Sequence, residues 1–158
     1  MFEISPLRPA EFARWQVLWN EYQQFYTVEL PAAVTEGTWR RIHEGTLQGL
    51  GARDSSGNLQ GIVHFLFHED TWSLEQACYL QDLYVDPSAR GAGCARQLIE
   101  GVAAAAKRVG ANAPYWLTHA TNADARRLYD KLGRNHGFIQ YVFARGCAGA
   151  AIPTDTGA

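Results

Sequence analysis

The sequence predicts an α/β fold in which helices cover both faces of a mixed sheet. Strand-like and helical apolar patterns alternate in the order strand, helix, helix, three strands, helix, strand, helix, strand. The turn-rich cluster 54–58 lies between two strand-like segments and predicts a hairpin. At 158 residues the chain has the length of one domain, and no repeat or linker divides it.

The first half of the chain is expected to form four strands and two helices. Residues 10–26 carry apolar side chains at helical spacing, from Phe12 to Phe25, and Pro31 stops the pattern. The expected strands are 2–7, 47–53, 59–68 and 79–85, and the expected helices are 10–26 and 33–43.

The second half is expected to form two helices and two strands. Apolar residues from Ala95 to Val109 recur at helical spacing, and Gly110 ends this amphipathic helix. A pattern like a capping box, starting at Thr121, opens the last helix, and Gly133 closes it. The last strands are expected over 114–119 and 138–144, and a single domain is expected over 1–145 with a short tail over 146–158.

Composition argues against several classes of protein. A formal charge of −2 offers no basic surface for nucleic acid. Three cysteines without C-x-x-C spacing suit a reducing compartment. No apolar run approaches the roughly 20 residues of a membrane span, and the start of the chain lacks a signal-peptide pattern. We therefore expect a cytoplasmic protein that binds neither nucleic acid nor membranes.

The most informative segment joins the strand over 79–85 to the helix that follows it. Gly91 and Gly93 bracket Ala92, so the backbone can approach a ligand without interference from Cβ atoms. The first N–H groups of the helix are free, and the helix dipole adds partial positive charge there. This arrangement is typical of a phosphate or pyrophosphate site, although the glycines alone also suit a simple tight turn.

Three glycine-rich phosphate motifs compete for this segment. No P-loop pattern occurs in the chain. A dinucleotide fingerprint would need Gly or Ala where Arg96 stands, and a carboxylate in the region 111–116, which has none. The remaining pattern, Arg/Gln-x-x-Gly-x-Gly/Ala, fits Arg90, Gly93 and Ala95.

With this pattern the sequence resembles the GNAT superfamily of acetyl-CoA-dependent N-acetyltransferases over about residues 3–145. Segments 19–26 and 38–39 are similar to the first helices of the yeast-type histone/polyamine acetyltransferases, and segments 79–85 and 122–133 are similar to that branch and to spermidine/spermine N-acetyltransferases. The resemblance implies one acetyltransferase domain with a mostly antiparallel sheet splayed at its centre. It also implies acetyl-CoA as cosubstrate and these cofactor-binding residues: Leu83, Tyr84, Val85, Arg90, Gly91, Ala92, Gly93, Cys94, Ala95, Arg96 and Asn122.

The implied chemistry is direct attack of an amine on the thioester in a ternary complex. Tyr129 is our candidate for the acid that protonates the leaving thiolate, because phenol and thiol have similar pKa values; the alternative is an ordinary packing residue. Asp82, the only carboxylate of its strand, is the candidate base, and a structural role is the alternative. Cys94 is expected to pack rather than act as a nucleophile. No metal site is expected, because His64 and His68 lie about 13 Å apart on a strand.

The expected acceptor is a primary amine of a small molecule that resembles a polyamine or an amino acid. Tyr26 and Gln81 are candidate substrate contacts, and Gln81 stands where the polyamine branch often has an acid. The alternatives are a protein lysine or N-terminus as acceptor, and a non-catalytic acyl-CoA-binding module. The apolar segment 138–143 suits either pairing with a second copy in a homodimer or an internal strand.

Overall fold

The structure is a computed structural model that describes residues 1–143. The chain divides into two compact units, Met1–Trp116 and Leu117–Ala158. The predicted tail over 146–158 lies outside the described residues.

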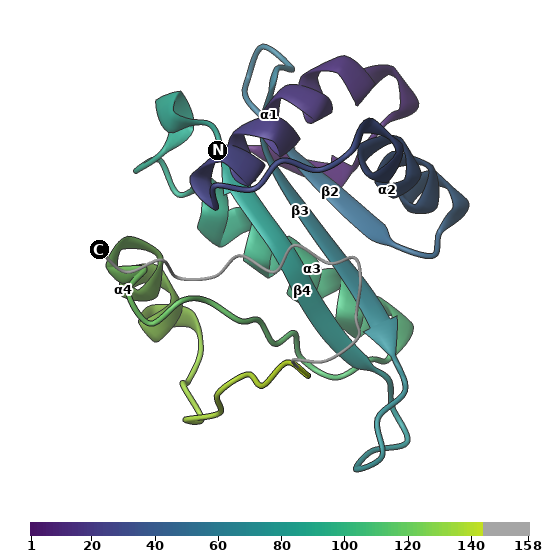
Figure 1. The fold of residues 1–158 in the computed structure, drawn as a ribbon, viewed down its shortest axis with the longest axis vertical. Coiled ribbons are helices and arrows are strands. Elements are labelled where there is room, and N and C mark those ends of the chain that lie inside the picture. The colour runs from purple at the N-terminus through teal and green to yellow at the C-terminus, as the bar shows by residue number, and fades with distance from the viewer. Residues whose placement is uncertain (144–158) are drawn as a thin grey trace. The chain divides into compact units, whose positions relative to one another are not determined.

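The first unit is an α/β structure whose elements follow the predicted order (Figure 1). Most boundaries lie within two residues of the expected ones, because apolar periodicity and the Pro and Gly positions are local signals. The elements are β1 (Glu3–Pro6), η1 (Pro9–Glu11), α1 (Phe12–Phe25), α2 (Ala32–Glu44), β2 (Gln48–Arg53), β3 (Leu59–His68), β4 (Ala77–Val85), η2 (Pro87–Ala89) and α3 (Cys94–Val109).

The four strands described in this unit form one antiparallel sheet in the order β1-β2-β3-β4. In the pairing of β3 with β4, His64 lies opposite Asp82 while the next residue, Phe65, lies opposite Leu80. Gln81 is therefore an extra residue in β4, which makes a β-bulge. This bulge decides which face of the sheet Asp82 occupies.

Helices cover both faces of the sheet, as predicted (Figure 1). On one face, His64 of β3 packs against Trp15 of α1. On the other face, a Cβ atom on Gly61 of β3 would lie 3.0 Å from the Sγ atom of Cys94 in α3. Since neighbouring residues of a strand point to opposite faces, α1 and α3 enclose β3 between them.

Two helices on the same face bury an apolar core around Trp15, which has no exposed surface. Its ring lies 4.7 Å from that of Trp39 in α2 and 6.0 Å from that of Trp19. The other buried members of this core are Leu7, Leu18, Leu59 and Ile62. The position of Trp15 at the centre of the core fixes the direction of its indole N–H group.

The strand predicted over 114–119 is wrong in its extent. Only Tyr115 pairs with the sheet, through one parallel bridge to Tyr79 in which Tyr115 donates to Cys78 and accepts from Leu80. The pairing stops just before the bulge at Gln81, because a bulge redirects the backbone groups that a neighbouring strand would need.

The second unit contains α4 (Ala123–Leu132) among its described residues. The helix begins one residue later than the pattern at Thr121 indicated, since Asn122 is the N-cap and accepts from the N–H of Ala125. Gly133 follows the last residue, as predicted.

The strand predicted over 138–144 is also wrong for the part that the structure describes. Residues 138–143 have no strand assignment, and residue 144 lies outside the described residues. Apolar alternation alone is insufficient, because a strand also needs a neighbouring edge to pair with. The large side chains of Phe138, Ile139, Tyr141, Val142 and Phe143 are exposed.

Candidate active site

The segment between β4 and α3 is an exposed turn built on two left-handed glycines. Gly91 has a φ of 76° and Gly93 has a φ of 82°, a region that other residues rarely adopt. Asp86 anchors the start of the turn by accepting hydrogen bonds from Ser88 and Arg14. These bonds lower the pKa of Asp86 to about 2, so the anchor stays ionised.

The surroundings of this turn fit a diphosphate group. A Cβ atom on Gly91 would meet no other atom within 4 Å, and one on Gly93 would meet only the Gln97 side chain at 3.7 Å. Gly93 is also the N-cap of α3, and no side chain caps the first turn of this helix. The turn therefore offers both open space and backbone N–H groups at the positive end of a helix dipole.

The end of β4 presents backbone groups beside this turn. Asp86 donates its N–H to Gln60 of β3, so Leu83 and Val85 direct their backbone groups away from β3 by alternation. These backbone groups face the opposite edge of β4. At that edge the bridge between Tyr79 and Tyr115 is the one pairing among the described residues. Arg90 closes part of this edge, because its Nε donates to the Val85 carbonyl at 3.1 Å and its guanidinium lies over the Tyr84 ring.

The first residues of α3 differ in exposure. Arg96 is exposed and lies 3.4 Å from Glu100 on the same helix. Cys94 is buried against the sheet, and burial raises the pKa of its thiol to about 11. Cys94 therefore has the packing role that the sequence indicated.

Asp82 lies on the α1 face of the sheet because of the bulge at Gln81. Without the extra residue, Asp82 would share the face of Leu80, which lies opposite Phe65 on the α3 side. Its Oδ1 accepts from the Tyr22 hydroxyl at 3.0 Å, and its Oδ2 lies 3.0 Å from Nδ1 of His64. The carboxyl side chain keeps 13% of its surface exposed. It is thus held firmly and is still reachable.

His64 is joined to Asp82 on one side and to Trp15 on the other. The Nε1 atom of Trp15 lies 2.9 Å from Nε2 of His64, and both residues are buried. An indole N–H group only donates hydrogen bonds, so Nε2 of His64 must accept. The proton of the neutral ring is then on Nδ1, which donates to Asp82.

Three tyrosines surround the Asp82 carboxylate. Burial, and then the nearby charge of Asp82, raise the pKa values of Tyr22, Tyr26 and Tyr79. These phenols therefore remain protonated, and Tyr22 keeps its donor role. The ring centroids of Tyr22 and Tyr26 lie 5.0 Å apart. Tyr26, which the sequence predicted to contact the substrate, therefore belongs to this group of tyrosines around Asp82.

The two substrate-side predictions have different surroundings. Tyr26 is the C-cap of α1, and the next residue, Thr27, has a positive φ of 54°. Buried Gln23 supports the loop that follows by accepting from the N–H of Leu30. Gln81, the bulge residue, has an exposed side chain.

Two predicted site residues belong to the second unit. Asn122 caps α4 through its Oδ1, and its Nδ2 donates to the Thr118 hydroxyl at 3.3 Å. Tyr129 lies two turns later on the same helix and is half-buried. The roles of both stay predictions.

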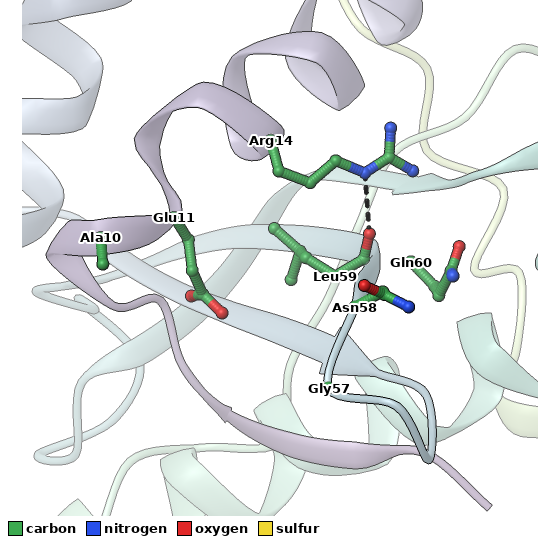
Figure 2. A pocket seen from close by; sticks show the side chains of 7 residues that line it. All are labelled: Ala10, Glu11, Arg14, Gly57, Asn58, Leu59 and Gln60. Carbon is green, nitrogen blue, oxygen red and sulfur yellow. Dashed lines mark hydrogen bonds between the residues drawn. The ribbon is translucent and has the colours of Figure 1, made fainter.

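A separate hollow of about 520 Å³ lies beside the start of α1 (Figure 2). Arg14 lines it and donates to the Leu59 carbonyl at 3.0 Å, and its guanidinium also pairs with Asp86. Glu11 in the same hollow is bound to buried Arg53. Both charged side chains are already paired, and no predicted site residue lines the hollow.

Sequence reasoning did not find Trp15, Tyr22 and His64 as members of the site. In the sequence His64 stands out only through its spacing of four residues from His68, and among residues 1–143 no cluster of metal-ligating side chains occurs. The link of His64 to Asp82 depends on the strand register and on a bulge that has no local signature. The spacing of Tyr22 and Tyr26, four residues apart on a helix, is a usable signal.

The chain is similar to known acetyltransferases in sequence. The profile of the Acetyltransferase (GNAT) family matches residues 12–133. The D-amino-acid N-acetyltransferase HPA3 of Saccharomyces cerevisiae is 35% identical over 141 residues, which cover 87% of this chain and 88% of the relative.

Solved structures share the fold. Ribosomal-protein-alanine N-acetyltransferase from Brucella melitensis superposes with a TM-score of 0.74 at 23% identity, covering 90% of this chain and 98% of the other. AAC(6')-Iy, solved with a bisubstrate analog containing CoA, has a TM-score of 0.79 at 17% identity, covering 93% of this chain and 99% of the other.

Proposed function

The chain belongs to the GNAT family of acetyltransferases, and we propose that it moves the acetyl group of acetyl-CoA directly to a primary amine of a small, amino-acid-like molecule. The observation that carries this proposal is the reachable Asp82 carboxylate among three tyrosines, on the strand that leads into an open glycine turn. The sequence relative that acetylates D-amino acids favours an amino acid over a polyamine.

GNAT enzymes use acetyl-CoA, and the residues of this chain fit its diphosphate. The backbone N–H groups from Gly91 to Arg96 would hold the diphosphate, with the φ values of Gly91 and Gly93 shaping the turn. Leu83, Tyr84 and Val85 would line the pantetheine arm along the edge of β4, and Asn122 would contact the same arm. Bound there, acetyl-CoA supplies an activated acyl group.

Asp82 is the proposed base. An amine with an ordinary pKa near 10.4 is about 0.04% neutral at pH 7, so its proton must be removed before it attacks. Asp82 takes this proton from the ammonium nitrogen and passes it to solvent. The nitrogen lone pair then forms the bond to the acyl carbon.

Tyr129 is the proposed acid. As the carbon–sulfur bond breaks, Tyr129 donates its proton to the departing sulfur, and it regains one as the new amide nitrogen loses its surplus proton. In sum the ammonium loses two protons, of which one ends on the CoA thiol and one in solvent. The roles of Asp82 and Tyr129 presuppose that residues 1–145 act as one acetyltransferase domain, as the family match over 12–133 favours.

Transfer without a covalent enzyme intermediate is consistent with the cysteines that the structure describes. Burial raises the pKa of Cys78 and of Cys94 to about 11, so neither thiol supplies a ready thiolate. A ternary complex predicts intersecting initial-rate lines when both substrates are varied, whereas ping-pong transfer predicts parallel lines.

The test measures thiol release from acetyl-CoA with a panel of acceptors. The panel contains D- and L-amino acids, spermidine, and peptides with either a free N-terminus or a lysine side chain. We expect release with amino acids and at least a tenfold lower kcat in Tyr129→Phe, because one proton donor is lost. Arg127→Lys, an exposed change on the same helix, is the control.

Other outcomes identify the alternatives. Acetylation of peptides alone would establish a protein-modifying enzyme, and CoA binding without any thiol release would contradict the proposal. Full activity of Tyr129→Phe would remove Tyr129 from the mechanism.

We also propose that the protein is cytoplasmic and binds no nucleic acid. The charge of −2 and the cysteine spacing support this. No helix within residues 1–143 is long and apolar enough to cross a membrane. Pairing of two copies through 138–143 stays a prediction, which the solution mass can test.

A further inference from the structure

We propose that Trp15 keeps His64 electrically neutral, so that the Asp82 carboxylate offers its whole negative charge to the ammonium group of the acceptor. This rests on the proposed function, in which Asp82 receives the amine. Trp15 and His64 are positioning residues, because they act on Asp82 from within the core.

The hydrogen-bond chain allows one arrangement of protons. Trp15 donates to Nε2 of His64 at 2.9 Å, and Nδ1 of His64 lies 3.0 Å from Oδ2 of Asp82. A second proton on His64 would have to sit on Nε2 and would face the indole N–H, donor against donor. Trp15 is fully buried and His64 is 2% exposed, so neither ring has room to turn toward water.

This arrangement decides the net charge of the site. If His64 took up a proton, it would form an ion pair with Asp82 and cancel the charge that attracts an ammonium group. With His64 neutral, no positive charge on this neighbour cancels the negative charge of the Asp82 carboxylate. Each carboxylate oxygen accepts one described hydrogen bond and has a second lone pair for the substrate.

The other titratable groups around the pair do not replace this charge. Tyr22 and Tyr26 face it from α1 and its C-cap, and Tyr79 faces it from β4; all three have raised pKa values and remain neutral. Glu21 of α1 interacts with Tyr84. The ring of His43 in α2 lies 4.4 Å from that of Trp39, and Trp39 in turn packs against Trp15.

The first experiment reads the protonation of His64 directly. Long-range ¹H–¹⁵N NMR of the wild-type protein should show a neutral ring with the proton on Nδ1 from pH 5.5 to 8, with His64→Asn used to assign the signal. In Trp15→Phe the same ring should take up a second proton within this range. A charged ring, or a proton on Nε2, in the wild type at pH 7 would overturn the proposal.

The second experiment follows the pH dependence of kcat/KM for the amine. In Trp15→Phe we expect activity relative to wild type to fall about tenfold or more between pH 7.5 and 5.5, because Nε2 of His64 no longer faces an N–H donor and the ring can become charged. The double variant Trp15→Phe/His64→Asn should lose this acid decline, because the Asn amide can donate to Asp82 but cannot become charged.

Trp19→Phe is the matched control for lost volume. It makes the same change on the same helix, beside His64, but the Nε1 of Trp19 has no hydrogen-bond partner among the described residues. Its pH profile should match that of the wild type. Equal profiles for Trp15→Phe and Trp19→Phe would contradict the proposal. If the wild type acetylates no amine, the proposed function fails, while the NMR result still tests the charge of His64.

Discussion

At the scale of single residues, Asp82 meets two requirements for a base that receives an amine: a fixed orientation and access for the substrate. Tyr22 and His64 each donate to one of its oxygens, which fixes the plane of the carboxylate. Part of its surface remains exposed, so a substrate can reach it. A carboxylate held in this way loses little conformational freedom when it binds an ammonium group.

Asp82→Asn tests the role of this charge. We expect kcat/KM for the amine to fall by about 10²–10⁴, because a base is lost and an amide N–H would face one of two donors. The loss should shrink as the pH approaches the pKa of the acceptor amine, since the fraction of neutral amine rises about tenfold per pH unit. Steady-state rates between pH 6.5 and 9.5 measure this.

The control is Glu100→Gln, which removes an exposed carboxylate from α3. It should leave the rates unchanged. A loss in Asp82→Asn that is constant at every pH would indicate a structural role for Asp82.

At the scale of elements, the glycine turn before α3 has a conformation that few residues adopt. Gly91 has a positive φ, yet the space around it is empty. Gly57 in the β2–β3 hairpin has the same two properties, with a φ of 83°. Comparing the same substitution at these two positions therefore distinguishes the effect of backbone strain from the effect on ligand binding.

Gly91→Ala should weaken CoA binding about tenfold, which corresponds to about 1.4 kcal/mol, because Ala in this conformation costs about 1–2 kcal/mol and shifts the turn. Gly57→Ala should lower the free energy of unfolding by a similar amount and leave CoA affinity unchanged. Calorimetric titration and chemical denaturation of both variants measure this. Equal CoA affinity in the two variants would exclude the turn as the diphosphate site.

The elements also show how far sequence reasoning reaches. The helix from Cys94 to Val109 and the glycine turn before it were predictable, because amphipathic spacing and Gly positions are local signals. The single bridge at Tyr115 in place of a strand was not, since strand formation depends on a distant edge. The face that Asp82 occupies depends on the bulge at Gln81, and strand alternation alone gives the opposite face.

At the scale of the whole first unit, one buried ion pair connects its start to the sheet. Arg53 of β2 is fully buried, and its guanidinium donates to both oxygens of Glu11 at 2.6 and 2.7 Å. It also donates to the Ser5 hydroxyl and the Pro6 carbonyl of β1. The pair thereby joins β1, β2 and the start of α1.

Glu11→Gln should lower the free energy of unfolding by about 3 kcal/mol at pH 7, because it leaves the charge of Arg53 buried without a counterion. Glu3→Gln, which breaks the exposed pair with Arg8, should cost less than about 1 kcal/mol. Chemical denaturation of both variants and the wild type measures the difference.

The effect of Glu11→Gln should depend on pH in one direction. Burial acts to raise the pKa of Glu11, but the bonds from Arg53 and Arg8 outweigh it, so the pKa lies below the ordinary value of 4.5. A carboxyl whose pKa is lowered in the folded state contributes its full stability above the unfolded pKa and loses it as the pH falls through the folded one. The difference in free energy of unfolding between wild type and Glu11→Gln should therefore be constant from pH 8 to about 5. It should become smaller as the pH falls below the ordinary pKa of 4.5. If this difference in free energy of unfolding stayed constant down to about pH 3, the charge of Glu11 would contribute nothing to folding, and only its hydrogen bonds would hold Arg53 in place.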